Sequence, residues 1–215
     1  MRRGQGGFGL LEVTLALAIG SMVLAAAGQL FASAHQSWRL QGAALRLQDD
    51  ARLALLRMAQ DIRMAGMFGC LRLAPGDFKD PAARQAFDHP LDVGSSSLDL
   101  VVAELAGHTG APDWTLLTDC HAEAQVYKNR AANPGTLMEI AVSRHQYRLS
   151  GNRLMFIRRG NAQPLVDHVR ELRVERVQAP QGEWVDLQLT LYEPTLQLEQ
   201  HHTLSVALRN PVSRP

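Results

Sequence analysis

The sequence has few cysteines and almost no net charge, and each scarcity argues against a class of function. Only two of its 215 residues are cysteine, Cys70 and Cys120, and neither stands in a C-x-x-C motif. No His-x₃-His spacing accompanies them, so the common zinc sites are not expected. The formal net charge is +1, and nothing in the composition indicates a nucleic-acid-binding surface.

Motifs of catalysis are also missing. The eight histidines are scattered, and no G-x-S-x-G or H-E-x-x-H motif occurs. His201 and His202 are adjacent and would point to opposite faces of a strand. Asp119-Cys120-His121 places a thiol beside a base, but neighbouring strand residues also diverge, and a disulfide would consume the thiol. We therefore expect no enzyme, no cofactor and no metal site.

Proline is absent between Phe8 and Ala74, and an uncharged apolar run fills part of this stretch. The run from Val13 to Ala34 has 22 residues, which as a helix would be about 33 Å long and would span a bilayer core of about 30 Å. Arg2 and Arg3 precede the run, so charge bias keeps the N-terminus cytoplasmic and directs the chain after Ala34 outward.

Three other interpretations of this segment are weaker. Ala32-Ser33-Ala34 looks like the cleavage site of a secretory signal, but a signal core has about 7 to 15 residues, and this run is longer. The residues Gly4 to Gly9 formally match G-x-G-x-x-G, a motif that requires a preceding strand. Arg2-Arg3 alone provides little support for a twin-arginine export signal.

The N-terminus resembles that of a type IV pilin precursor. The resemblance rests on a basic leader ending in Gly7, on Phe8, Leu10 and Leu11, and on Glu12 before the apolar run. It implies that a prepilin peptidase cleaves between Gly7 and Phe8 and methylates the new N-terminus. The apolar stretch then serves first as an inner-membrane anchor and later as the packing core of a helical fibre.

Glu12 is the candidate assembly residue. A carboxylate at the centre of a membrane helix costs about 2.5 to 3.5 kcal/mol and less near the edge, so its presence favours a function. The helix macrodipole favours negative charge in the first turn. The resemblance implies that Glu12 pairs with the terminal amine of a neighbouring subunit. The alternative is an interfacial glutamate that only caps the helix.

An amphipathic helix is predicted to continue from the apolar run. Apolar residues recur at steps of three and four, with charged residues between them. The apolar positions are Leu40, Ala44, Leu47, Ala51, Leu55, Met58, Ile62 and Ala65, and Asp61 is among the charged ones. Together the two parts form one helix of nearly sixty residues, about 85 Å long. Gly20, Gly28 and Gly42 are candidate bends, with close helix packing as the alternative for Gly20 and Gly28.

Strand patterns follow the helix, which is expected to end near Gly66 to Gly69. The predicted strands are Leu98 to Leu105, Ala124 to Lys128, Leu137 to Val142, His145 to Leu149, Arg153 to Arg158, Val169 to Val177, Trp184 to Leu191 and Thr203 to Leu208. The fold class is therefore α+β, with a long N-terminal helix packed on a mainly antiparallel β-sheet domain. The predicted parts are a leader (1–7), a membrane and polymerisation segment (8–34), an amphipathic helix (35–67) and a β-rich periplasmic domain (68–215).

Both cysteines follow the anchor and therefore lie on the oxidising side of the membrane. Pairing Cys70 with Cys120 would close a loop of about fifty residues and stabilise the fold by about 4 kcal/mol in the chain-entropy model. Two separate buried thiols are the alternative.

Later segments resemble the PilW branch of minor pilins. They are Asp61 to Cys70, Leu117 to Cys120, Pro164 to Val169 and Ala207 to Asn210. This resemblance implies a subunit that primes type IV pilus assembly and has a position at the fibre tip. Its implied partners are other minor pilins, the major pilin and prepilin peptidase. The J-type pseudopilin of type II secretion has a similar pattern. A membrane-anchored periplasmic binding domain is the alternative of another class.

Overall fold

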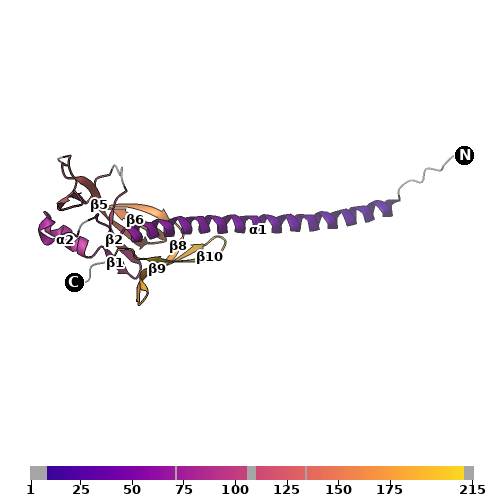
Figure 1. The fold of residues 1–215 in the computed structure, drawn as a ribbon. Coiled ribbons are helices and arrows are strands. Elements are labelled where there is room, and N and C mark those ends of the chain that lie inside the picture. The colour runs from indigo at the N-terminus through magenta and orange to yellow at the C-terminus, as the bar shows by residue number, and fades with distance from the viewer. Residues whose placement is uncertain (1–8, 71, 106–109, 134, 211–215) are drawn as a thin grey trace. The chain divides into compact units, whose positions relative to one another are not determined.

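A long helix is followed by a β-rich region in the computed structural model, which describes residues 9–70, 72–105, 110–133 and 135–210 (Figure 1). The chain divides into two units, residues 1–46 and residues 47–215. Helix α1 (Leu10–Met64) contributes to both units, and each unit is described by itself.

Helix α1 forms without interruption because no proline falls within it. It runs through Gly20, Gly28 and Gly42, so none of these glycines ends the helix. Directly after the helix, the side-chain amide of Asn210 donates to the backbone oxygen of Ala65 at 2.9 Å. The next residue, Gly66, has a φ of +74°, the left-handed conformation that commonly stops a helix.

Two short helices and ten strands follow α1 among the described residues. The helices are η1 (Pro75–Asp77) and α2 (Pro81–Asp88). The strands are β1 (Leu91–Gly94), β2 (Ser97–Ala103), β3 (Trp114–Thr118), β4 (Ala124–Lys128), β5 (Met138–Ser150), β6 (Arg153–Arg158), β7 (Asn161–Val166), β8 (Val169–Ala179), β9 (Gly182–Glu193) and β10 (Leu198–Ala207).

The strands form two sheets, and every pairing between them is antiparallel. The larger sheet has seven strands in the order β1-β2-β5-β3-β4, with β6 beside β5 and β7 beside β6. The smaller sheet has the order β10-β9-β8. Strand β5 organises the larger sheet, because its first residues pair with β3 and its last residues with β6.

The main core lies between the last turns of α1 and both sheets. Six of the eight apolar positions predicted for the amphipathic helix are buried: Leu47, Ala51, Leu55, Met58, Ile62 and Ala65. They pack with strand residues such as Leu98, Tyr147 and Leu189, which are all fully buried. Burying a side chain of this size contributes about 1.5 to 3 kcal/mol, so this stripe explains how the second unit is held together.

A second core lies under α2. Asp80 caps this helix by accepting from the backbone amide of Ala82 at 3.2 Å, and its other carboxylate oxygen accepts from the indole nitrogen of Trp114 at 3.2 Å. The ring of Phe87 lies 5.8 Å from that of Trp114. Helix α2 thereby covers the part of the larger sheet that contains β3 and β4.

The predicted α+β class is confirmed, and some of its details are wrong. Strands β4 and β6 have the predicted bounds, whereas Leu137 to Val142 and His145 to Leu149 are parts of the single strand β5. They are continuous because β2 pairs across the intervening Ser143 and Arg144. Two sheets are present in place of one. The sequence patterns missed β1, β3, β7 and α2.

Candidate functional site

The first part of α1 exposes its apolar side chains. Every residue from Gly9 to Arg39 is exposed, with Leu10 at 87% and Leu24 at 75%. Among the described residues, α1 is the one helix long and apolar enough to cross a membrane, judged by its length and composition. An apolar surface of this extent needs a covering that the residues of this unit do not provide.

Glu12 lies in the first turn of this exposed segment. Its backbone amide donates to the oxygen of Gly9 at 2.9 Å, so the helix start is formed by the main chain. No residue in the described part of the chain hydrogen bonds or ion pairs with its carboxylate. The carboxylate is therefore available to a partner outside this segment. Gly7 and Phe8, the predicted processing residues, lie outside the described residues.

The same segment contains the glycines Gly20 and Gly28, which leave room at the helix surface. A β-carbon added at Gly20 or at Gly28 would meet no atom within 4 Å. Neither glycine is thus required by packing inside this chain. Close approach of another helix remains a prediction for both positions.

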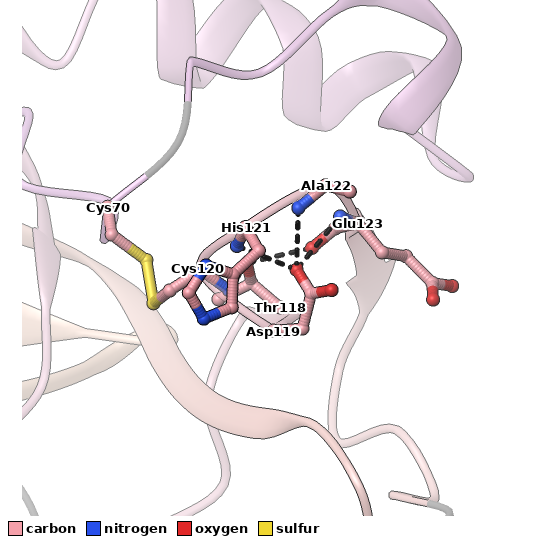
Figure 2. The surroundings of a disulfide bond; sticks show 7 residues. All are labelled: Cys70, Thr118, Asp119, Cys120, His121, Ala122 and Glu123. Atoms are coloured by element: carbon pink, nitrogen blue, oxygen red, sulfur yellow. Dashed lines mark hydrogen bonds between the residues drawn. A yellow bond between two sulfur atoms is a disulfide. The ribbon is translucent and has the colours of Figure 1, made fainter.

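A disulfide joins the segment after α1 to the turn between β3 and β4 (Figure 2). The bonded residues are Cys70 and Cys120, whose Cα atoms are 5.3 Å apart. The preceding Gly69 has a φ of +102°, and a β-carbon there would lie 3.0 Å from the side chain of Ile140. Only glycine therefore fits this approach to the sheet.

The turn that carries Cys120 is fixed by Asp119. One carboxylate oxygen of Asp119 accepts from the backbone amides of His121, Ala122 and Glu123, each at 2.9 Å (Figure 2). These bonds lower the pKa of Asp119 to about 2. Asp119, Cys120 and His121 thus form a loop, in contrast to the strand expected for them. The thiol of Cys120 is consumed by the disulfide.

A cluster of buried charged side chains, which the sequence patterns did not indicate, joins α1 to the larger sheet. His145 of β5 is 2% exposed and lies between two carboxylates. Its Nδ1 is 2.7 Å from Asp61 of α1, and its Nε2 is 3.2 Å from Glu104, the residue after β2. The hydroxyl of Tyr147 donates to the same Asp61 oxygen at 2.6 Å.

Two arginines complete this cluster. Arg158 of β6 lies 2.9 Å from the carboxylate of Glu104, and Arg57 of α1 lies 3.6 Å from that of Asp61. The guanidinium of Arg57 also stands 5.4 Å from the ring centre of Phe156. We call Arg57, Asp61, Glu104, His145, Tyr147 and Arg158 the buried charge cluster.

The cluster favours a protonated His145. Both ring nitrogens face carboxylates, and only the imidazolium form can donate from both. Burial alone lowers the pKa of His145, but the hydrogen bonds to Asp61 and Glu104 outweigh burial and raise it. Burial likewise opposes ionisation of Glu104, yet the bonds from His145 and Ser143 lower the pKa of Glu104 to about 2.

A cavity of about 230 Å³ lies beside the cluster and is also lined by Gln60 and Met64. A cavity of this volume has room for water molecules beside His145. The amphipathic pattern places Asp61 among the charged residues outside the apolar stripe, yet Asp61 is only 6% exposed. The sequence of β5 contained one signal of this cluster. Ser143, His145 and Tyr147 stand at every second position and therefore share one face of the strand, and all three are buried.

Comparison with known proteins identifies the N-terminal segment. A family model described as a prokaryotic N-terminal methylation motif matches residues 2–28. Searches of curated proteins and of solved structures found no match. The matched segment contains Glu12 and the start of the exposed apolar helix, which supports a type IV pilin-like protein, either a pilin or a pseudopilin. The motif implies processing by a prepilin peptidase and assembly with other pilins, and the apolar helix indicates membrane anchoring.

Among the residues that the structure describes, no group of three or more histidine, cysteine, aspartate or glutamate side chains is arranged to hold a metal ion. The buried charge cluster is built from ion pairs and hydrogen bonds within the chain. Its chemistry is that of a polar link between helix and sheet.

Proposed function

We propose that this chain is a PilW-type minor pilin that helps to prime type IV pilus assembly and has a place at the fibre tip. The observation that carries the proposal is the methylation motif at residues 2–28, joined to an exposed carboxylate at the start of an exposed apolar helix. A simple membrane anchor has no need of Glu12, whereas a subunit that docks through its N-terminus does.

The proposed life cycle has two stages. The chain is first held in the inner membrane by α1, with its β-rich unit in the periplasm, and prepilin peptidase cleaves it between Gly7 and Phe8. It then joins other minor pilins and the major pilin, and α1 exchanges lipid for a bundle of similar helices. Its role is structural, without catalysis or a cofactor.

Processing is tested by mass spectrometry of the chain extracted from membranes. The proposal expects a mature chain that begins at N-methylated Phe8. A mature N-terminus at His35 would identify the apolar run as an ordinary secretory signal. An uncleaved chain would leave a membrane-anchored periplasmic domain as the better description.

The role of Glu12 is tested with Glu12→Ala in a deletion background, with Thr14→Ala as the matched control. Thr14 is exposed on the same helix, and its hydroxyl bonds only to the local backbone oxygen of Leu11. The Glu12→Ala chain should be processed and inserted normally. The amount that co-purifies with the other minor pilins should be only a small fraction of that of the unchanged chain. Full piliation by Glu12→Ala would reduce Glu12 to an interfacial cap.

The secretion pseudopilin is the second candidate, because the motif is common to pilins and pseudopilins. A strain that lacks this chain separates the two. Few pili and no twitching, with normal protein secretion, support the minor pilin. Normal pili with loss of secreted enzymes would assign the chain to type II secretion.

A further inference from the structure

Three rings lie along one side of α1, around the end of the apolar run. Phe31 and His35 have ring centres 6.5 Å apart and nearly parallel planes, at 10°. His35 and Trp38 follow with centres 6.3 Å apart. Phe31 is 77% exposed and Trp38 is 71% exposed, so the rings face outward from the helix.

The placement of these rings along α1 is uneven. Phe31 and Trp38 are the only phenylalanine, tyrosine or tryptophan residues of the helix, which extends from Leu10 to Met64. Both stand close to Ala34, where the apolar run stops. Arg39, the next residue after Trp38, is the first arginine, lysine, aspartate or glutamate after Glu12.

The spacing from Glu12 matches the dimensions of a bilayer. Phe31 follows Glu12 by 19 residues, about 29 Å along a helix, and the hydrocarbon core is about 30 Å thick. Trp38 follows Glu12 by 26 residues, about 39 Å, and the bilayer with its headgroups is about 40 to 45 Å thick. With Glu12 at one surface, Trp38 therefore reaches the headgroups of the other.

We propose that Phe31, His35, Trp38 and Arg39 form an interfacial collar that holds α1 in the lipid headgroup layer on the side from which the chain emerges. Phe31 marks the edge of the hydrocarbon. The indole of Trp38 lies among the ester groups, where its N–H donates to lipid oxygens, and Arg39 meets the phosphates. Aromatic residues with one apolar and one polar end concentrate at this depth.

The collar rests only on the membrane-anchoring part of the proposed function. Its occupant is lipid, because the rings continue directly from the apolar segment and their distance from Glu12 is that of a bilayer. A neighbouring subunit would not require the rings to lie at this particular distance. The depth of Trp38 in a membrane is therefore the property to measure.

The full chain is reconstituted into vesicles of phosphatidylethanolamine and phosphatidylglycerol, and flotation establishes that it is bound. Tryptophan fluorescence is compared between the unchanged chain and Trp38→Phe, so that Trp114 and Trp184 contribute equally to both. The difference spectrum isolates Trp38. Lipids brominated near the headgroup and lipids brominated near the chain end then report its depth.

The expected result is stronger quenching of Trp38 by the shallow bromines than by the deep ones. A shifted probe sharpens the comparison: Gly42→Trp in the Trp38→Phe chain places the indole about 6 Å farther along the helix. A β-carbon at position 42 meets no atom within 4 Å. This probe should be quenched at least several-fold less by the shallow bromines.

Several outcomes would overturn the collar. Deep bromines quenching Trp38 more strongly would place it within the hydrocarbon. An absence of quenching by either lipid, in a chain that floats with the vesicles, would place the rings in water or against protein. A chain that does not float at all would refute membrane anchoring itself, which separates failure of the proposed function from failure of the collar.

Discussion

Glu12 and Asp61 are two carboxylates on one helix, and their surroundings differ completely. Asp61 is buried and contacts His145, Tyr147 and Arg57 from its own chain. Glu12 is exposed and has no such partner among the described residues. Asp61 therefore stabilises the fold of one subunit, whereas the carboxylate of Glu12 is available to a partner outside its own chain, as its proposed role in assembly requires.

The apolar side chains of the two regions differ in the same way. Leu24 and Leu30 are 75% and 73% exposed in the first part of α1, whereas Met58 and Ile62 in its last turns are 0% and 1% exposed. The last turns find their covering in the two sheets. The first part requires lipid or other helices, so one continuous helix serves two environments.

The largest expected effect is the loss of Asp61. Asp61→Ala removes one of the two carboxylates that face His145 and the one that pairs with Arg57, and breaking a buried ion pair costs about 3 to 5 kcal/mol. The melting temperature of the full chain in detergent should fall by roughly 10 °C. Asp50→Ala, an exposed position on the same helix, should change the stability by less than about 0.5 kcal/mol.

Equal melting temperatures for Asp61→Ala and Asp50→Ala would contradict the prediction that Asp61 stabilises the fold. They would mean that the buried charge cluster contributes nothing to the link between α1 and the larger sheet. The contrast between Asp61 and Glu12 would then lose its physical basis.

The disulfide is expected to have the next largest effect, because it secures the chain directly after α1. Cys120→Ser should lower the free energy of unfolding by about 2 to 4 kcal/mol, since the unfolded chain is no longer closed across 50 residues. The double variant Cys70→Ser with Cys120→Ser should behave like the single one. Peptide mapping that finds both thiols free in periplasmic protein would refute the bond.

The cluster also predicts a pH dependence of smaller size. The pKa of His145 is raised in the folded state, so its stabilising contribution is complete below its ordinary value of 6.5 and is lost as the pH rises through the folded value. The pKa of Glu104 is lowered from 4.5 to about 2, so its contribution is complete above 4.5 and is lost as the pH falls toward 2. Stability should therefore be greatest between about pH 4.5 and 6.5.

Thermal melting between about pH 5 and 9 measures this dependence. His145→Gln is the matched variant, since it keeps a polar side chain and removes the titration. Its curve should be flatter on the alkaline side than that of the unchanged chain. Identical slopes would show that other groups control the response.

The amphipathic half of α1 and its exposed apolar half differ in how far sequence could predict them. The periodic apolar positions predicted six buried residues correctly, because a helix repeats its face every three or four residues. The burial of Asp61 was not predictable in this way. It depends on His145 and Tyr147, which lie 84 and 86 residues away in the sequence and reach Asp61 only when β5 packs on α1.

The missed elements have local causes. All five residues of β3 are buried, so it lacks the alternation that marks a strand with one wet face. Helix α2 has only 8 residues and starts at a proline, which hides it among turn signals. For the exposed half of α1, the motif and the apolar run predicted the segment, but its partners belong to other molecules and no pattern within one chain identifies them.

The smallest expected effect on stability is that of Glu12, and this is the sharpest test of the comparison. Glu12→Gln removes a charge that contacts no described residue of its own chain, so the free energy of unfolding of the β-rich unit should stay within about 0.5 kcal/mol of the unchanged value. The same variant should nevertheless reduce recovery of the chain in the assembly complex at least tenfold, because an amide cannot pair with a charged terminal amine as a carboxylate does.

Thermal melting and co-purification from one preparation measure both effects of Glu12→Gln together. A Glu12→Gln chain that melts several degrees lower would show that Glu12 has a partner within its own subunit, and the division of the two carboxylates between folding and assembly would then be wrong.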